Sequence, residues 1–381
     1  MTVPDWRPSP LGDVLRKSGN RVILVSDAQY KQVTVRLWGK GLALRGVCKG
    51  AEIAAYEQVQ VESGQFIISK IDARHGAFGL VPPELAGAVV SSDFPCFAID
   101  VERVIPKFLL WFSRTERFVS LCRRASEGTT NRVRLKEAAF LASEIGLPSL
   151  NEQHGIVERL EAVSTRLKAR AETAERQQAE LTAMLDSAYK QICADAPRAP
   201  LGKVAPLVKR TVTIDQNESY TEFGIRSFYR GLFQRRTLSG NEFTWQSLYR
   251  IEPGDLVFSN IMAWEKAIAL VDEADAHCVG NHRMLTCEPD RSRIVPGALF
   301  FYFTTRHGFA QIEAGSPGSI ARNKTLSPDA LQAIDVPVPS LDAQEWFEKL
   351  RTKVAALRTH QAAIVIDADT LLPSMLNQIY G

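Results

Sequence analysis

Two pairs of loop-like segments carry side chains that can bind a polyanion. Residues 70–76 and 128–134 contain cationic, imidazole and amide groups, at Lys70, Arg74, His75, Asn131, Arg132 and Arg134. Residues 260–266 and 318–324 contain similar groups and one indole, at Asn260, Trp264, Lys266, Arg322, Asn323 and Lys324. Arginine and lysine donate to phosphates and guanine, asparagine pairs with adenine, and aromatic rings stack on a displaced base or pack on sugars. These segments therefore predict contacts to nucleic acid.

The same residues also have simpler interpretations. Cations on loops are usually solvated, and the Gly-Thr-Thr and Gly-Ser-Ile stretches before helices can act simply as N-caps. Trp264 can equally pack in a core.

Motifs for bond-making chemistry are absent from the sequence. It contains no Gly-x-x-x-x-Gly-Lys-Ser/Thr loop, no Asn/Asp-Pro-Pro-Tyr/Phe motif, no Cys-x-x-Cys pair and no His-Glu-x-x-His helix. The group that comes closest to a set of metal ligands comprises His277, Cys278, His282 and Cys287. Its spacing fits no standard zinc pattern. The sequence therefore predicts no metal site and no catalytic residue, and the chain is expected not to be an enzyme.

An internal repeat of 190 residues places the two pairs of loops in corresponding positions. The stretch PLGDV at Pro10 returns as PLGKV at Pro200, and similar matches continue through both halves. This pattern indicates tandem duplication of a globular unit followed by a long helix. Arg36 and Arg226 share one position in the frame, which suggests either a phosphate contact made alike by both halves or a salt bridge kept in both. In contrast, Arg-His at residues 74–75 corresponds to Trp-Glu at residues 264–265, so the two copies differ strongly in chemistry at this loop.

A long helix is predicted after each globular unit. The openings LPSLNEQ at residues 147–153 and VPSLDAQ at residues 338–344 align, and apolar residues then recur at steps of three and four. This spacing is typical of a coiled-coil seam, and a helix this long needs a partner to cover its seam. The two helices are predicted to pair antiparallel within the chain, with ordinary bundle helices as the simpler alternative.

Composition limits the class of protein. A chain of 381 residues with 45% hydrophobic content can build two or more domains. The net charge of +3 is compatible with a polyanion partner without requiring one. No apolar run approaches the roughly 20 residues needed to span a bilayer, and the N-terminus does not resemble a signal peptide. The six scattered cysteines favour reduced thiols and a cytoplasmic location.

Each globular unit is predicted to be α+β, with a curved or barrel-like sheet. In the first unit the short β-branched or aromatic runs near residues 22–25, 33–38, 66–68 and 97–99 predict strands. Helices are predicted over residues 106–123 and 135–144, and the second unit repeats this order.

The order of domain, helix, domain and helix resembles the specificity subunit of type I restriction-modification systems, over essentially the whole chain. The two helix openings are similar to the start of that family's spacer helix, although Ala343 stands where the first copy has Glu152. The segment GDLVFS at residues 254–259 is similar to its usual mid-domain strand. The resemblance implies target-recognition domains at 1–146 and 194–337, a central coiled-coil helix at 147–193 and a C-terminal one at 338–381.

The resemblance also implies a role and partners. Such a subunit reads a bipartite target in double-stranded DNA, one half-site per domain, and recruits two modification (methyltransferase) subunits, with restriction (translocase-nuclease) subunits for cleavage. S-adenosylmethionine, ATP and Mg are then expected on the partner subunits and none on this chain, with no membrane contact. A helix about 60 Å long, at about 1.5 Å per residue, is expected to act as a ruler that sets the gap between half-sites.

Two alternatives remain at this point. The chain could serve another methylation-based defence complex. It could also be a coiled-coil scaffold that binds proteins, which predicts no salt-dependent affinity for DNA.

Overall fold

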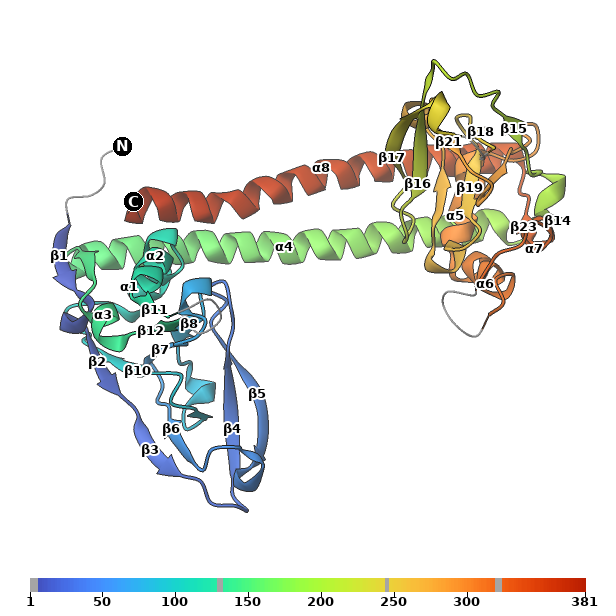
Figure 1. The fold of residues 1–381 in the computed structure, drawn as a ribbon. Coiled ribbons are helices and arrows are strands. Elements are labelled where there is room, and N and C mark those ends of the chain that lie inside the picture. The colour runs from blue at the N-terminus through green and yellow to red at the C-terminus, as the bar shows by residue number, and fades with distance from the viewer. Residues whose placement is uncertain (1–5, 129–132, 244–246, 319–323) are drawn as a thin grey trace. The chain divides into compact units, whose positions relative to one another are not determined.

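The computed structural model describes residues 6–128, 133–243, 247–318 and 324–381, and the side chains of all of these except 362–369. The chain divides into two compact units, which we describe separately. Unit 1 comprises residues 1–173 and 362–381, and unit 2 comprises residues 174–361. The two long helices are each shared between the units, so neither unit coincides with one half of the sequence (Figure 1).

The globular part of unit 1 is built mainly from two antiparallel sheets, a four-stranded one in the order β2-β10-β7-β8 and a five-stranded one in the order β3-β6-β9-β4-β5, in which only β4 and β9 pair in parallel. Its strands are β1 (Arg7–Pro10), β2 (Leu15–Ser18), β3 (Asn20–Ile23), β4 (Gln29–Val35), β5 (Leu42–Lys49), β6 (Glu57–Gln60), β7 (Phe66–Ile68), β8 (Phe78–Leu80), β9 (Val89–Val90), β10 (Cys96–Ile99), β11 (Ser126–Glu127), β12 (Arg134–Leu135) and β13 (Glu144–Leu147). Its helices are α1 (Pro106–Ser113), α2 (Glu116–Arg124), α3 (Glu137–Leu141) and the 3-10 helix η3 (Ala73–His75).

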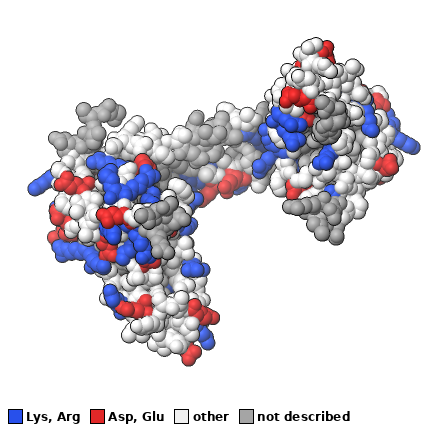
Figure 2. All heavy atoms as spheres, viewed as in Figure 1, with Lys and Arg blue, Asp and Glu red and all other residues white. Residues whose placement is uncertain are grey.

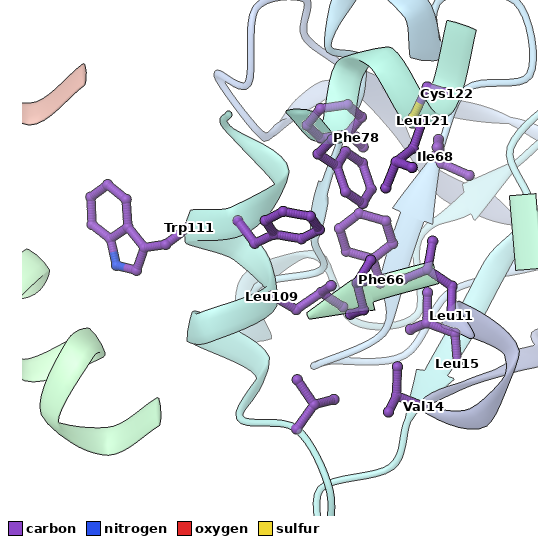
Figure 3. Packing of buried hydrophobic residues seen from close by; sticks show 14 of the residues in the cluster. Leu11, Val14, Leu15, Phe66, Ile68, Phe78, Leu109, Trp111, Leu121 and Cys122 are labelled. Carbon is purple, nitrogen blue, oxygen red and sulfur yellow. The ribbon is translucent and has the colours of Figure 1, made fainter. Parts of the chain in front are cut away.

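Aromatic side chains fill the core of unit 1 beneath α1 and α2. The ring of Phe118 meets those of Phe78 and Phe66 edge to face, with centroids 4.9 and 6.0 Å away. Figure 3 shows Phe66 and Phe78 close together, whereas Trp111 points away from them. Trp111 is nevertheless buried, and its indole Nε1 donates to Glu161 on the long helix at 2.9 Å.

Unit 2 repeats the plan of unit 1. Its sheets have the orders β15-β18-β21-β16-β17 and β20-β19-β22, again with one parallel pair, β16 with β21. Its strands are β14 (Arg198–Pro200), β15 (Arg210–Thr211), β16 (Ser219–Ile225), β17 (Leu232–Ser239), β18 (Tyr249–Arg250), β19 (Leu256–Ser259), β20 (Ile268–Leu270), β21 (Val279–Gly280), β22 (Met284–Cys287) and β23 (Asp335–Pro337). Its helices are α5 (Pro296–Thr304), α6 (Arg306–Ala314), α7 (Pro328–Gln332) and the 3-10 helix η7 (Ala263–Glu265).

The long helices α4 (Leu150–Cys193) and α8 (Leu341–Tyr380) run in opposite directions in both units. In unit 1 the start of α4 shares a core with the end of α8, including Leu160 and Tyr380. In unit 2 the end of α4 meets the start of α8, where the rings of Tyr189 and Phe347 lie 5.0 Å apart. Together with the duplicated α+β units, this pairing confirms the predicted fold class.

The opening motif of each long helix serves to anchor a buried glutamine. The Gln153 Oε1 accepts from Ile105 N at 2.8 Å, and its Nε2 donates to the Arg103 and Pro148 carbonyls, both at 2.9 Å. Gln344 makes the same three bonds in unit 2, with Val295, Arg293 and Pro339. Each glutamine thus ties a long helix to the segment that begins α1 or α5.

Three local expectations differ from the structure. The helix predicted over residues 106–123 is two helices, because Thr115 ends α1 and its side chain accepts from Phe118 N to cap α2. The helix predicted over 135–144 shortens to α3, and its last part becomes strand β13, paired with β1. The strands of each unit form separate sheets where a curved or barrel-like sheet was predicted. Among the described residues, no helix is long and apolar enough to cross a membrane.

Candidate nucleic-acid interface

In unit 1 a β-hairpin turn and a short loop are held against each other. The turn joins β4 to β5, and its two central residues, Trp38 and Gly39, are left-handed with φ of 63° and 65°. Their amides donate to the carbonyls of His75 and Gly76 at 2.8 and 2.9 Å. The turn is therefore fixed by backbone bonds to the loop after η3, which leaves its side chains free to vary.

The same arrangement occurs in unit 2 between β16 and β17. Phe228 and Tyr229 are left-handed, with φ of 62° and 57°, and donate to the carbonyls of Glu265 and Lys266 at 3.1 and 3.0 Å. A non-glycine residue seldom adopts this conformation, and a bulky one still less. The repeat of such strain at one position in both units indicates a shared requirement there.

In unit 1 the structure brings three predicted residues to this turn. Arg36 begins the turn and donates from Nη2 to the Lys40 carbonyl at 2.6 Å. Arg74 Nε donates to His75 Nε2 at 3.1 Å, and the His75 ring meets the Trp38 ring edge to face, with centroids 6.3 Å apart. Arg36 and His75 are exposed and Arg74 is partly exposed, so all three can reach a ligand at the turn.

Two other predicted residues of unit 1 are held in ion pairs. The Lys70 Nζ lies 2.7 Å from Glu137, and Arg134 lies 2.8 Å from Asp93. Burial raises the pKa of Glu137, but hydrogen bonds from Lys17 and Lys70 outweigh it, so the pKa lies below its usual range. These pairs give Lys70 and Arg134 a structural role, and their contact to nucleic acid stays a prediction.

In unit 2 two predicted lysines each lie over an aromatic ring. The Lys324 Nζ lies 5.2 Å from the centre of the Trp264 ring, and Trp264 Nε1 donates to the Ile261 carbonyl at 2.9 Å. Lys266 lies over the Phe309 ring at 5.0 Å. The side-chain oxygen of Asn260 is buried without a hydrogen-bond partner among the described residues.

Arg226 lies at the turn of unit 2, where Arg36 lies in unit 1. Its guanidinium bonds the Leu232 carbonyl and covers the Phe233 ring at 5.0 Å. Neither Arg36 nor Arg226 forms a salt bridge within the described chain, so the alternative of a salt bridge kept in both copies finds no support there. Four predicted residues lie outside the described residues, namely Asn131, Arg132, Arg322 and Asn323.

A basic surface adjoins the turn of unit 1. Figure 2 shows Lys and Arg side chains gathered over α1 and α2, and the exposed cations of these helices are Lys107, Arg114, Arg123 and Arg124. Arg114 and Arg123 line a hollow of about 190 Å³ together with Trp38, Arg74 and His75, and Arg123 forms an ion pair with Glu116, which also lines it. The predicted loop thus continues into a cationic surface that suits a polyanion.

The turn aromatics and the α1–α2 arginines were not among the residues predicted to bind DNA. Trp38 and Phe228 are 71% and 62% exposed. An exposed aromatic at one frame position in both copies could have been found by comparing the repeats. The arginines could not, because only folding places α1 and α2 beside the turn.

Nothing in the described parts of the chain points to a catalytic centre that uses a metal. No group of three or more His, Cys, Asp or Glu residues that could hold a metal ion occurs there. His277 and Cys278 are neighbours, with Nε2 and Sγ 3.6 Å apart, but they gather no further ligand among the described residues.

Comparison with known proteins found one family that part of the chain resembles. Residues 4–180 match the family described as type I restriction modification DNA specificity domain. A search of curated proteins found no match. This match covers somewhat less than half of the chain, and unit 2 repeats the sheet plan of unit 1.

Two solved structures have the same fold over essentially their full length. A chain from a structure on complex assembly and conformational transition of the type I R-M system is 19% identical, with a TM-score of 0.70, covering 100% of this chain and 99% of that one. The HsdS subunit from Thermoanaerobacter tengcongensis is also 19% identical, with a TM-score of 0.59 and coverage of 100% and 98%. This chain therefore has the fold of a type I specificity subunit.

Proposed function

We propose that this chain is the DNA specificity subunit of a type I restriction-modification complex and reads a bipartite target, one half-site per globular domain. The observation that carries the proposal is the duplicated turn and loop, which keep their backbone bonds in both units and differ in side chains. A duplicated reader needs a common frame and different contacts. The match of residues 4–180 to the DNA specificity domain family supports the same role.

The proposal extends to partners and cofactors. The chain is non-catalytic, acts in the cytoplasm, and positions two modification subunits and the restriction subunits on DNA. S-adenosylmethionine, ATP and Mg belong to those partners. The long helices α4 and α8 supply the surface for their assembly.

Mapping of DNA methylation tests this function. Long-read sequencing of host DNA with the gene intact and deleted should show loss of one split, adenine-methylated motif on deletion. Replacing residues 6–128 by the corresponding domain of a relative should then change one half-site and keep the other. The proposal would be contradicted if deletion of the gene left every methylated motif in place. It would also be contradicted if the domain replacement changed both half-sites.

The ruler can be tested in the same assay. Deleting one heptad from both α4 and α8 removes about 10 Å of helix, which corresponds to about three base pairs. The preferred gap should change, or binding should be lost. A functional complex with an unchanged gap would refute the ruler.

A further inference from the structure

One sequence pattern recurs at the two hairpin turns. The turns read RLWGKG at residues 36–41 and RSFYRG at residues 226–231. In both turns the third residue is an exposed aromatic, and the first and fifth residues are exposed cations. Basic residues interleaved with an aromatic match the chemistry of a nucleic-acid backbone beside a base or sugar.

The aromatic of each turn is held outward at a cost. Its left-handed backbone is unfavourable for a bulky side chain by about 1 kcal/mol or more. Trp38 nevertheless remains 71% exposed, so burial does not compensate for the strain. Glycine or asparagine would form the turn more easily. The choice of an aromatic in both units therefore points to a ligand.

Contacts within each turn position the flanking groups. The Arg230 guanidinium lies 5.9 Å from the Phe228 ring, and Arg36 closes its turn through the Lys40 carbonyl. The loop bonds described above hold both turns against their domains. The aromatic and its cations thus form one rigid, preorganised contact.

We propose that each hairpin turn is a DNA-binding finger, in which Trp38 or Phe228 packs against a base or sugar and the flanking cations bind phosphates. The flanking cations are Arg36 and Lys40 in unit 1, and Arg226 and Arg230 in unit 2. The inference rests on the proposed function, because it takes DNA as the ligand. It adds that the two fingers act alike, whatever sequence each domain reads.

Titration of the full-length chain with a duplex of fixed length, at several salt concentrations, tests the fingers. Trp38→Asn and Phe228→Asn remove the aromatic and place a residue that tolerates the left-handed backbone. Each should lower the affinity for DNA roughly five- to hundredfold, as for loss of one stacking contact. The salt dependence of binding should not change. The melting temperature should stay the same or rise. Trp38→Phe, the aromatic of unit 2, should retain affinity.

The cations give an independent readout. Lys40→Ala and Arg230→Ala should each reduce the slope of log K against log salt by about 0.9, as for loss of one phosphate contact. Tyr56→Ala is the matched control, because Tyr56 is an aromatic residue that is 72% exposed. It directly precedes β6, where Glu57 pairs with Ile23 of β3, and it is not part of the turn between β4 and β5. This variant should change neither affinity nor slope.

The outcomes separate the two proposals. A wild-type chain without salt-dependent binding would contradict the proposed function. Wild-type binding that neither asparagine variant weakens, or a Tyr56→Ala effect as large as that of Trp38→Asn, would overturn only the fingers.

Discussion

The two hairpin turns share their backbone but lie against different surroundings. In unit 1 the second turn residue is Gly39, and Arg114 lies beside it, since a Cβ on Gly39 would come 3.1 Å from the Arg114 Cγ. In unit 2 the corresponding residue is Tyr229, whose hydroxyl donates to the Phe303 carbonyl at 2.7 Å. Thr304 replaces Arg114 at the same frame position.

The difference extends over the helix behind each turn. The α2 sequence ERFVSLCRR carries three arginines and one glutamate, whereas α6, RHGFAQIEA, carries one of each. The helix behind the turn thus carries mainly cations in unit 1, whereas in unit 2 it brings the Phe309 ring near Tyr229. Backbone hydrogen bonds fix the frame in both, so the side chains can diverge without loss of the fold.

The largest expected effect on stability comes from the buried glutamine that both units share. Gln153→Ala and Gln344→Ala each remove three hydrogen bonds from a side chain that is 0% or 1% exposed and leave backbone groups buried without partners. Each should destabilise its own unit by about 3 kcal/mol or more. Hydrogen exchange of the two units by mass spectrometry measures this, with exposed Gln191→Ala as the control. Unequal losses would mean that the two anchors are not equivalent.

The next effect concerns the cationic surface found in unit 1. Replacing Arg114 and Arg123 by alanine should reduce the salt slope of DNA binding by up to about 1.8, because two phosphate contacts are lost. Thr304→Ala with Glu313→Ala, at the same positions in unit 2, should not reduce it. A titration from low to high salt measures both. An equal drop in both double variants would remove the contrast between the units.

A smaller effect is expected at the loop residue that differs between the units. Gly76 has φ of 78°, and a Cβ there would lie 2.9 Å from Gly39 N and 3.0 Å from Trp38 Cα. Gly76→Lys should therefore cost about 2 kcal/mol through strain and contact. Lys266→Gly should change stability by less than about 1 kcal/mol, because relief of strain offsets chain entropy. Thermal unfolding checks this, and equal losses would contradict it.

The smallest effect depends on pH and is confined to unit 1. Burial raises the pKa of Glu161, but hydrogen bonds from Lys107 and Trp111 outweigh it, so the pKa lies below its usual range. The folded state then gains stability that is complete above the ordinary pKa of about 4.3 and is lost as the pH falls through the lowered value.

Glu161→Gln should therefore destabilise unit 1 at pH 7 by about 1 kcal/mol or less, since the pair with Lys107 is half exposed. The difference from wild type should close below about pH 4. Thr352→Val, at the corresponding position of α8, should show no such pH dependence. A difference that persists in acid would show that Glu161 acts through packing.

Much of the architecture was predictable from the sequence. The repeat revealed two α+β units, and the aligned openings revealed two long helices that contain Gln153 and Gln344. The period of the apolar residues also predicted a seam between the two helices, and in unit 2 Gln178 bonds Gln361 there at 3.1 Å. These features depend on local periodicity, which a sequence states directly.

The candidate site was only partly predictable. The loops at Arg74 and Trp264 were found from their residue types, but the ion pairs of Lys70 and Arg134 were not. The site at the turn exists because β4 and β5 place Trp38 against His75, distant in sequence, and because α1 places Arg114 beside Gly39. Such contacts arise from strand register and helix packing, which join segments whose spacing carries no periodic signal, so only the tertiary structure decided them.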